Sequence, residues 1–277
     1  MHPYVILDVF TDTPLEGNGL AVFPEGAAVP EDRLQAIARE MNLSETVFVL
    51  PPEGDGHARI RIFTTVEELP FAGHPVLGTA YYLADRDGLD RVVLEAGVGP
   101  VPVEFAREDG RLGIGRMSQP IPTWEPYDRA GELLAALGVA RSELPVERYV
   151  NGPEYVNIVL DDPERVAALR PDMNALAELG VAVSCFAGSG KRWKTRMFAP
   201  GLGVNEDPAT GSAAGPLAVH LVRHGRIGYG DEIEISQGAE IARPSTLYAR
   251  VLGEGDRVDA VEVAGSAVLV ARAELLV

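Results

Sequence analysis

The sequence predicts an α+β fold made of two similar domains, and three observations lead to this prediction. The chain has 277 residues, which exceeds the roughly 100–200 residues of a typical single domain. Short segments with strand-like alternation outnumber the helical segments along the chain. A strand, a glycine-containing loop and a helix rich in small residues follow one another in each half. With 46% hydrophobic residues, the chain can build a core in both domains.

In the first half, alternating apolar residues predict strands, and an i, i+3, i+4, i+7 pattern predicts a helix. Pro30 opens this helix, which carries Leu34, Ile37, Ala38 and Met41 on one face, and Asn42 ends it because Asn tolerates the left-handed conformation. Pro75 suits the first position of a second helix, which would place His74 at or beside its N-cap. The strands expected here are 5–9, 20–23, 46–50, 58–63, 92–94, 101–105 and 112–114.

In the second half, Pro120, Pro122 and Pro126 predict a linker. Helices are expected at 132–137, with Gly138 as the C-cap, and after Asp162, an N-cap followed by Pro163 at the first helical position. Pro171-Asp172 opens another helical segment. A further helix follows Ser212. The expected strands are 155–160, 181–186, 194–198, 247–251 and 267–277.

The two halves share a recurring unit. Arg61-Ile-Phe63 precedes Pro70-Phe-Ala-Gly-His74, and Arg196-Met-Phe198 precedes Pro208-Ala-Thr-Gly-Ser212. The two prolines are 138 residues apart, and so are Gly73 and Gly211, and His74 and Ser212. We infer a duplicated domain with a site in the cleft between the copies, where ligands commonly bind.

The two glycines mark helix starts that can bind an anion. The first N–H groups of a helix have no internal partner, and the helix dipole places partial positive charge there. Gly73 and Gly211 allow the backbone to approach a ligand closely. Two such starts facing a cleft would bind a carboxylate or an enolate-like oxygen. The alternative is that both belong to well-capped core helices with no ligand.

Composition excludes several classes of function. The formal net charge of −17 argues against a nucleic-acid partner, which needs clustered Lys and Arg, and no run reaches the ~20 apolar residues of a membrane span. We therefore expect a cytoplasmic protein. Cys185, the single cysteine, excludes a racemase with two thiols. His220 and His224 are four residues apart without an evident third metal ligand, and no nucleotide-binding glycine motif is complete, so no metal or cofactor is expected.

The sequence resembles the PhzF-like phenazine biosynthesis isomerase family, within the diaminopimelate epimerase-like fold. The resemblance covers most of the chain. It is carried by Asp8-Val-Phe10 with Gly17-Asn18, by Asn42-Leu-Ser-Glu-Thr46, by Arg61-Ile-Phe-Thr64 with Glu68-Leu-Pro-Phe-Ala-Gly-His-Pro75, and by Arg196-Met-Phe-Ala-Pro200 with Glu206-Asp-Pro-Ala-Thr-Gly-Ser212. Gly19 is a departure, since members of the family often have Pro after Gly-Asn.

The resemblance implies two pseudo-symmetric domains, each with a barrel-like sheet around a central helix, and a homodimer. The expected domains are 1–117 and 118–277, with the C-terminal strand 265–277 as a candidate to complete the first. The resemblance makes Glu45 the proton-transferring residue. It makes His74, Asp207 and Ser212 polar partners of the substrate, with the Gly73 and Gly211 amides lining the pocket.

These residues predict a cofactor-independent isomerase that moves a proton on a small carboxylated metabolite through Glu45. Two alternatives stay open on the sequence. One is an epimerase or racemase of an amino-acid-like substrate, and the other is a non-catalytic protein that binds a small molecule.

Overall fold

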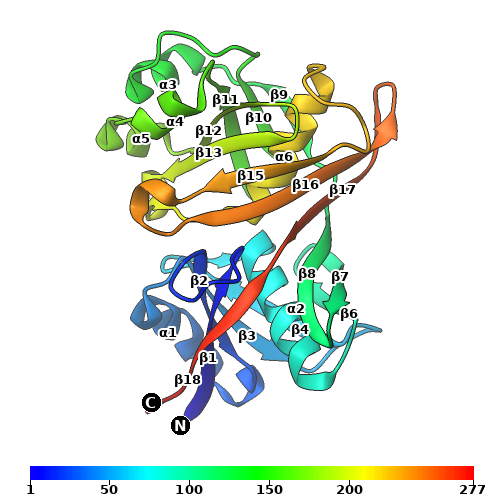
Figure 1. The fold of residues 1–277 in the computed structure, drawn as a ribbon. Coiled ribbons are helices and arrows are strands. Elements are labelled where there is room, and N and C mark those ends of the chain that lie inside the picture. The colour runs from blue at the N-terminus through cyan, green and yellow to red at the C-terminus, as the bar shows by residue number, and fades with distance from the viewer. The chain divides into compact units, whose positions relative to one another are not determined.

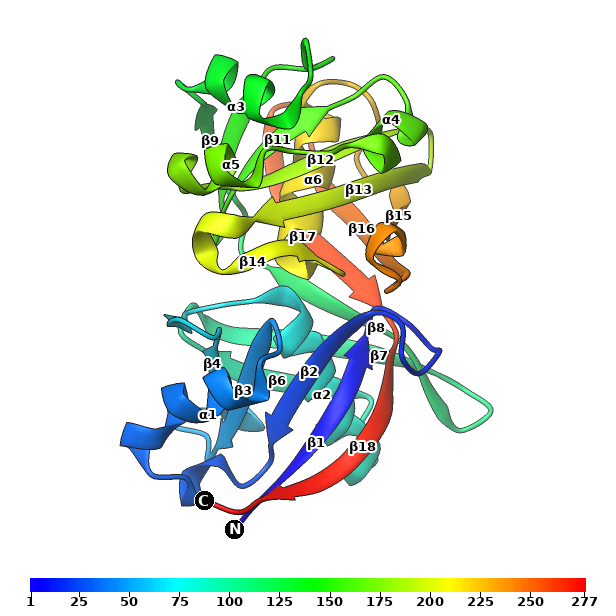
Figure 2. The same cartoon turned by 90° about the vertical axis from the view of Figure 1, so that its left-hand side faces the viewer.

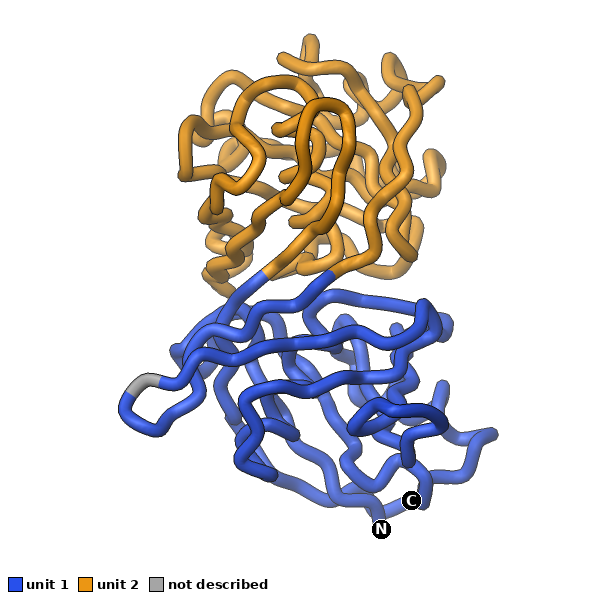
Figure 3. Tube along the Cα trace, turned by 90° about the vertical axis from the view of Figure 1, so that its right-hand side faces the viewer, with its two compact units in different colours: residues 1–118, 264–277 blue, residues 119–263 orange. Residues whose placement is uncertain are grey.

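The computed structural model covers residues 1–277 and describes all of them apart from the side chain of Glu108. The chain divides into two compact units (Figure 3). Unit 1 contains Met1–Ser118 and Ala264–Val277, and unit 2 contains Gln119–Val263. In the described part of the chain, no helix combines the length and the apolar character that a membrane crossing requires.

Unit 1 is a mixed sheet with two α-helices (Figure 1). Its helices are α1 (Leu34–Met41) and α2 (Gly73–Asp87), and short 3₁₀ turns lie at Gly26–Ala28 and Glu31–Arg33. Its strands are β1 (His2–Val9), β2 (Asn18–Phe23), β3 (Glu45–Leu50), β4 (Ala58–Phe63), β5 (Glu68–Leu69), β6 (Arg91–Ala96), β7 (Gly99–Glu108), β8 (Arg111–Gln119) and β18 (Ala267–Leu275).

The strands of unit 1 follow one another in the order β18, β1, β2, β3, β4, β6 and β7. The pairs β2–β3 and β4–β6 are parallel, and the other pairs in this series are antiparallel. β18 and β1 bring both ends of the chain together, with His2 opposite Leu275 (Figure 2). The C-terminal strand therefore completes the sheet of the N-terminal unit.

Helix α2 is the central helix of unit 1. It contacts β1, β2, β3, β6, β7 and β18, and most of its residues from Gly73 to Ala84 are buried. A helix enclosed on all sides needs small and apolar residues around its whole circumference. Gly78 shows how close the packing is, since an added Cβ would lie 2.7 Å from side-chain atoms of Leu20 and Val9.

Unit 2 repeats this construction with additional helices. Its helices are α3 (Ala130–Leu137), α4 (Pro163–Ala168), α5 (Met173–Leu179) and α6 (Gly211–Arg223), with 3₁₀ turns at Pro200–Leu202 and Ala239–Ile241. Its strands are β9 (Thr123–Pro126), β10 (Glu147–Val150), β11 (Glu154–Val159), β12 (Ala182–Ser189), β13 (Arg192–Ala199), β14 (Val204–Asp207), β15 (Glu232–Gln237), β16 (Ser245–Glu254) and β17 (Arg257–Gly265).

The strand order β9, β10, β11, β12, β13, β15 and β16 of unit 2 matches the order in unit 1. The pairs β11–β12 and β13–β15 are parallel and the others in this series are antiparallel. Helix α6, buried from Gly211 to Leu221, contacts β11 and β16 and takes the place of α2. The predicted pair of similar barrel-like domains with central helices is confirmed.

The three short helices of unit 2 cover the other face of its sheet. Leu133 of α3, Val166 of α4 and Leu176 of α5 are fully buried in one cluster with residues of β11, β12 and β13. Asp162 caps α4 through its side chain, as predicted. A helix also begins after Pro171-Asp172 as predicted, and there the Asp172 side chain caps α5. In unit 1, α1 ends at Asn42 in the left-handed conformation, also as predicted.

Three predictions about local structure are wrong. Pro30 was predicted to open the first helix but precedes the 3₁₀ turn at Glu31–Arg33, and α1 begins only at Leu34. α2 begins at Gly73 after an extended Ala72 N-cap, so His74 is its second residue and Pro75 its third. Pro75 has no backbone N–H to donate, but the residues of the first turn need no internal hydrogen-bond donor, so proline fits at the third position as well as at the first. Pro126 was predicted to lie in a linker but ends strand β9, which pairs with β10.

Candidate functional site

Glu45 and His74 lie together in unit 1. Glu45 begins strand β3, and its side chain is 15% exposed. His74 lies in the first turn of α2 and is 3% exposed. The Oε2 atom of Glu45 is 3.3 Å from Nδ1 of His74. A carboxylate with limited solvent access is thus held beside an imidazole at the start of a buried helix.

Burial keeps the His74 ring neutral. Loss of hydration lowers the pKa of His74 to about 3, although a backbone hydrogen bond to Gly19 opposes the change. A neutral imidazole has one N–H and one lone pair. Depending on its tautomer, His74 can donate to an ionised Glu45 or accept from a protonated Glu45. This partner therefore suits a carboxyl group that gains and loses a proton.

In each unit, an Arg–Glu ion pair fixes the segment before the central helix. Arg61 of β4 makes a two-pronged ion pair with Glu68, with distances of 2.7 and 2.6 Å. Arg196 of β13 makes one with Glu206, at 2.8 and 2.7 Å. Such paired bonds define geometry as well as adding energy. The repeated Arg-x-Phe motif thus anchors the loop that leads into α2 and α6.

The predicted residues of unit 2 lie at the start of α6. Asp207 ends β14 and is 6% exposed. Its Oδ2 accepts a hydrogen bond of 2.6 Å from the hydroxyl of Thr210, the N-cap residue of α6. Gln237 at the end of β15 donates to the Asp207 carbonyl oxygen at 2.8 Å. Asp207 is therefore held from both its side chain and its backbone.

Gly211 and Ser212 form the first turn of α6. The carbonyl of Gly211 accepts from Gln119 at 2.8 Å, and that of Ser212 accepts from Asn151 at 2.9 Å. The Ser212 hydroxyl is 2.6 Å from the hydroxyl of Tyr155. Among the described residues, neither Ala72 of α2 nor Thr210 of α6 caps its helix through a side chain. The amides at both helix starts keep the character of an anion site.

In the structure, the residues predicted from the sequence fall into two local groups. Glu45, Gly73 and His74 lie in unit 1, and Asp207, Gly211 and Ser212 lie in unit 2. Sequence reasoning did not identify Thr210, Gln237 and Tyr155, which contact Asp207 or Ser212. Thr210 stands inside the recurring motif and could have been noted there. Gln237 and Tyr155 follow no motif, and only the fold brings them to the start of α6.

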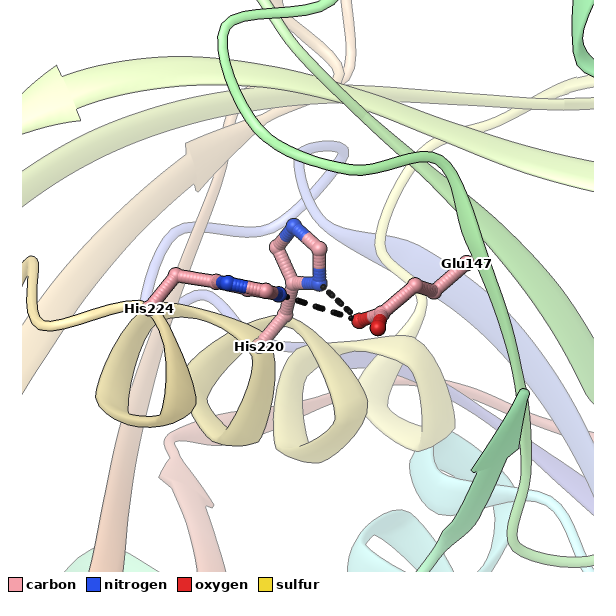
Figure 4. A group of neighbouring side chains, drawn as sticks. All are labelled: Glu147, His220 and His224. Carbon is pink, nitrogen blue, oxygen red and sulfur yellow. Dashed lines mark hydrogen bonds and ion pairs between the residues drawn. The ribbon is translucent and has the colours of Figure 1, made fainter. Parts of the chain in front are cut away.

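A second cluster of titratable groups lies at the other end of α6 (Figure 4). His220 Nδ1 and His224 Nε2 lie 3.2 and 3.1 Å from Oε2 of Glu147, a residue of β10. The three ligand atoms lie within 4.8 Å of one another, close enough to hold a metal ion. The expectation that these histidines have no third candidate ligand is wrong. Glu147 is more than 70 residues away in sequence, so spacing gave no sign of it.

The contacts of Arg223 indicate that this cluster is an ion-pair network rather than a metal site. Its guanidinium donates to Oε2 of Glu147 at 2.7 Å and to the hydroxyl of Tyr149 at 2.6 Å, and it stacks 4.2 Å from the Trp124 ring. The cation already neutralises the carboxylate that a metal would need. Hydrogen bonds from His220, Arg223, His224 and Tyr149 lower the pKa of Glu147 against the opposing effect of burial.

Cys185 belongs to the hydrophobic core of unit 2. It is fully buried in β12. Burial raises the pKa of its thiol, which keeps it protonated and unreactive.

Comparison with known proteins identifies the family. A family model described as phenazine biosynthesis-like protein (PhzC-PhzF) matches residues 7–273. The trans-2,3-dihydro-3-hydroxyanthranilate isomerase of Pseudomonas aeruginosa is 55% identical over 267 residues, covering 96% of each chain. The enzyme of the same name from Pseudomonas fluorescens is 50% identical over 277 residues, all of both chains. These relatives confirm the prediction that the chain is an isomerase.

A solved structure supports the same relationship. The structure of a predicted epimerase from Pseudomonas aeruginosa matches this fold with a TM-score of 0.84, at 34% identity and over 100% of both chains. The epimerase-like fold expected from the sequence is thereby confirmed. The chain belongs to the phenazine biosynthesis-like protein family (PhzC-PhzF).

Proposed function

We propose that this chain is a trans-2,3-dihydro-3-hydroxyanthranilate isomerase and that Glu45 transfers the proton. The substrate proposal is supported by the two isomerases of that name at 55% and 50% identity. The proposal for Glu45 is carried by one observation, its contact of 3.3 Å with a His74 that burial keeps neutral.

The reaction requires one proton to move within the substrate. Glu45, as a carboxylate, takes a proton from one carbon, and the electron pair left behind spreads into the conjugated system. The same group, now a carboxylic acid, returns a proton to another carbon, so the formula of the substrate is unchanged. His74 can accept from the acid form or donate to the carboxylate, so it contributes to both halves of the cycle.

The substrate carboxylate needs a binding site that does not compete with Glu45 for protons. The first-turn amides of α2, at Gly73 and His74, and of α6, at Gly211 and Ser212, are suitable donors because helix starts favour anions. We further propose that Asp207 and Ser212 bind the polar groups of the substrate. Both are buried and held by neighbours, Asp207 by Thr210 and Ser212 by Tyr155.

The test is turnover of synthetic trans-2,3-dihydro-3-hydroxyanthranilate, followed by absorbance and by NMR of the product. We expect the wild-type protein to convert it and Glu45→Gln to lose roughly 10²–10⁴-fold in kcat, since the amide keeps the shape but carries no proton. The matched control is Glu40→Gln, at an exposed position of α1, which should leave kcat unchanged.

Two outcomes would contradict the proposal, and each would contradict a different part. A folded Glu45→Gln protein with more than about a tenth of the wild-type rate would remove Glu45 from the chemistry. Failure of the wild type to convert this substrate, with exchange of the α-proton of an amino acid instead, would favour the epimerase alternative.

We also propose that the chain forms a homodimer, as its resemblance to the family implies. Light scattering during size-exclusion chromatography should give about twice the chain mass of 29.6 kDa. A mass that stays at that of one chain over a range of concentrations would contradict this.

A further inference from the structure

Asp207 belongs to a hydrogen-bond relay whose direction can be assigned. The Gln237 amide nitrogen donates to Oγ1 of Thr210 at 3.0 Å, and the Gln237 amide oxygen accepts from the Thr210 backbone N–H at 3.1 Å. The hydroxyl of Thr210 lies 2.6 Å from Oδ2 of Asp207. Because the Thr210 oxygen already accepts from Gln237, its one proton is directed onto the Asp207 carboxylate.

Because of this relay, the Thr210 side chain does not cap α6. A Thr at an N-cap normally accepts a hydrogen bond from an amide of the first turn, and losing that bond costs about 1 kcal/mol. Here Thr210 is the N-cap of α6, but its side chain makes no capping bond. The hydroxyl instead donates to the Asp207 carboxylate. The stabilisation that a capping bond would give α6 is therefore absent, and the carboxylate is held in its place.

The other unit shows that the fold does not need this relay. In the recurring motif, the positions 138 residues before Asp207 and Thr210 are Leu69 and Ala72. β6, the counterpart of β15, ends in Ala96 where β15 ends in Gln237. Unit 1 thus builds the same strand, loop and helix with apolar residues at all three places.

We propose that Thr210 and Gln237 are positioning residues that fix the orientation of the Asp207 carboxylate toward the substrate. All three side chains are nearly buried, with exposures of 7%, 2% and 6%, so solvent cannot replace a lost partner. The inference rests on the proposed role of Asp207 in substrate binding. An ionised carboxylate only accepts hydrogen bonds, so the substrate group it meets is a donor, an amine or a hydroxyl.

The test replaces each relay member by an apolar residue of similar size, in Thr210→Val and Gln237→Leu. We expect kcat/KM to fall roughly ten- to a hundredfold in either variant, the range for a hydrogen bond to a charged group. The double variant should be no worse than the single ones, because they break one relay. Thr210→Ser keeps the hydroxyl and should restore most of the activity. Thr246→Val, at an exposed position of β16, is the control.

A further pair of variants separates positioning from a role in folding. Thr210→Val is repeated in an Asp207→Ala background, where positioning predicts no additional fall in kcat/KM. The same fall in both backgrounds would mean that Thr210 acts by supporting α6, and would overturn the proposal.

A crystal structure of Thr210→Val gives a readout that does not depend on turnover. We expect the Asp207 carboxylate to turn away from its present orientation. An unmoved carboxylate would overturn the positioning role even if kcat/KM had fallen. A turned carboxylate with unchanged kcat/KM would instead remove Asp207 from the proposed substrate site and leave the positioning role standing.

Discussion

Ala182 of unit 2 occupies the place that Glu45 holds in unit 1. In unit 1, Thr46 of β3 lies opposite Phe63 of β4. In unit 2, Val183 of β12 lies opposite Phe198 of β13. Glu45 and Ala182 each come directly before the first of these partners. Ser212 likewise stands where the repeat has His74, so the carboxylate–imidazole pair is present in one copy of the motif and missing from the other.

The same repeat provides a matched pair of ion pairs for a stability experiment. Arg196 and Glu206 are nearly buried, with side-chain exposures of 6% and 9%, whereas Arg61 and Glu68 are 22% and 41% exposed. Breaking a buried pair leaves a buried charge and typically costs 3–5 kcal/mol, while an exposed pair contributes about 1 kcal/mol or less. We predict that Arg196→Ala lowers the free energy of unfolding by about 3 kcal/mol or more.

The matched control is Arg61→Ala, for which we predict a loss of about 1 kcal/mol. Urea unfolding followed by circular dichroism measures both. Equal losses in the two variants would show that burial does not decide the strength of these pairs. Arg196 also donates to the carbonyl of Leu169 at 2.9 Å, which adds to the difference we expect.

His74 should make the protein less stable as the pH falls. Its pKa is lowered to about 3 in the folded state and is about 6.5 in an unfolded chain. Between these values the unfolded state binds the additional proton, so the free energy of unfolding falls by about 1.4 kcal/mol for each pH unit of acidification. We predict that His74→Asn reduces this dependence between pH 4 and pH 6.

The pH experiment compares slopes rather than absolute stabilities, since His74→Asn also changes packing. Unfolding free energies from urea titrations at several pH values give the slopes. His2→Asn, at the first residue of β1, is the control for the chemical change from His to Asn. A His74→Asn protein with the wild-type slope would mean that His74 takes up its proton as readily in the folded state as in the unfolded state.

The helix ends that the sequence predicted correctly are those determined by interactions between residues close together in the chain. Asn42, Asp162 and Asp172 end or begin helices because of bonds within a few residues, and the structure has them where expected. The repeat was readable because Arg61 and Arg196 stand in copies of one motif. The start of α2 was misplaced because Pro75 is tolerated at any position of the first turn.

Contacts between distant segments could not be read from the sequence. Gln237 reaches Thr210 across 27 residues, and Glu147 reaches His220 across 73. Neither pair follows a helical or strand period, so only the strand order β9 to β16 brings them together. Glu45 itself looks like an ordinary residue at the start of a strand, and family resemblance rather than pattern singled it out.

The cluster at the end of α6 leads to a prediction about metals. Arg223 holds the Glu147 oxygen that faces His220 and His224, and a divalent cation would have to displace it against charge repulsion. We predict that dialysis against a chelator leaves kcat unchanged and that added Zn²⁺ does not raise the melting temperature. Arg223→Met is the informative variant, because without the guanidinium the cluster should gain affinity for Zn²⁺. A raised melting temperature of the wild type in Zn²⁺ would contradict the prediction.

The last prediction concerns the path of the proton and follows from the difference between the two units at one position, which is Glu45 in unit 1 and Ala182 in unit 2. A racemase with two bases removes a proton with one group and delivers a solvent-derived one with the other, so product formed in D₂O carries deuterium at every turnover. Here Ala182 stands where a second carboxylate would be, and the one thiol, Cys185, is fully buried. If Glu45 both takes and returns the proton, part of the substrate hydrogen should stay on the product.

The measurement is turnover of trans-2,3-dihydro-3-hydroxyanthranilate in D₂O, with the product examined by NMR at early conversion. We expect less than one deuterium at the reprotonated carbon, because the Glu45 side chain is only 15% exposed and a sheltered acid exchanges slowly with solvent. Product incubated with the enzyme in D₂O for the same time is the control for later exchange. Complete deuteration from the first turnovers would mean that Glu45 exchanges before it returns the proton or that a second group delivers it. These explanations separate with temperature, since exchange and turnover have different activation energies, while delivery by a second group gives full deuteration at every temperature.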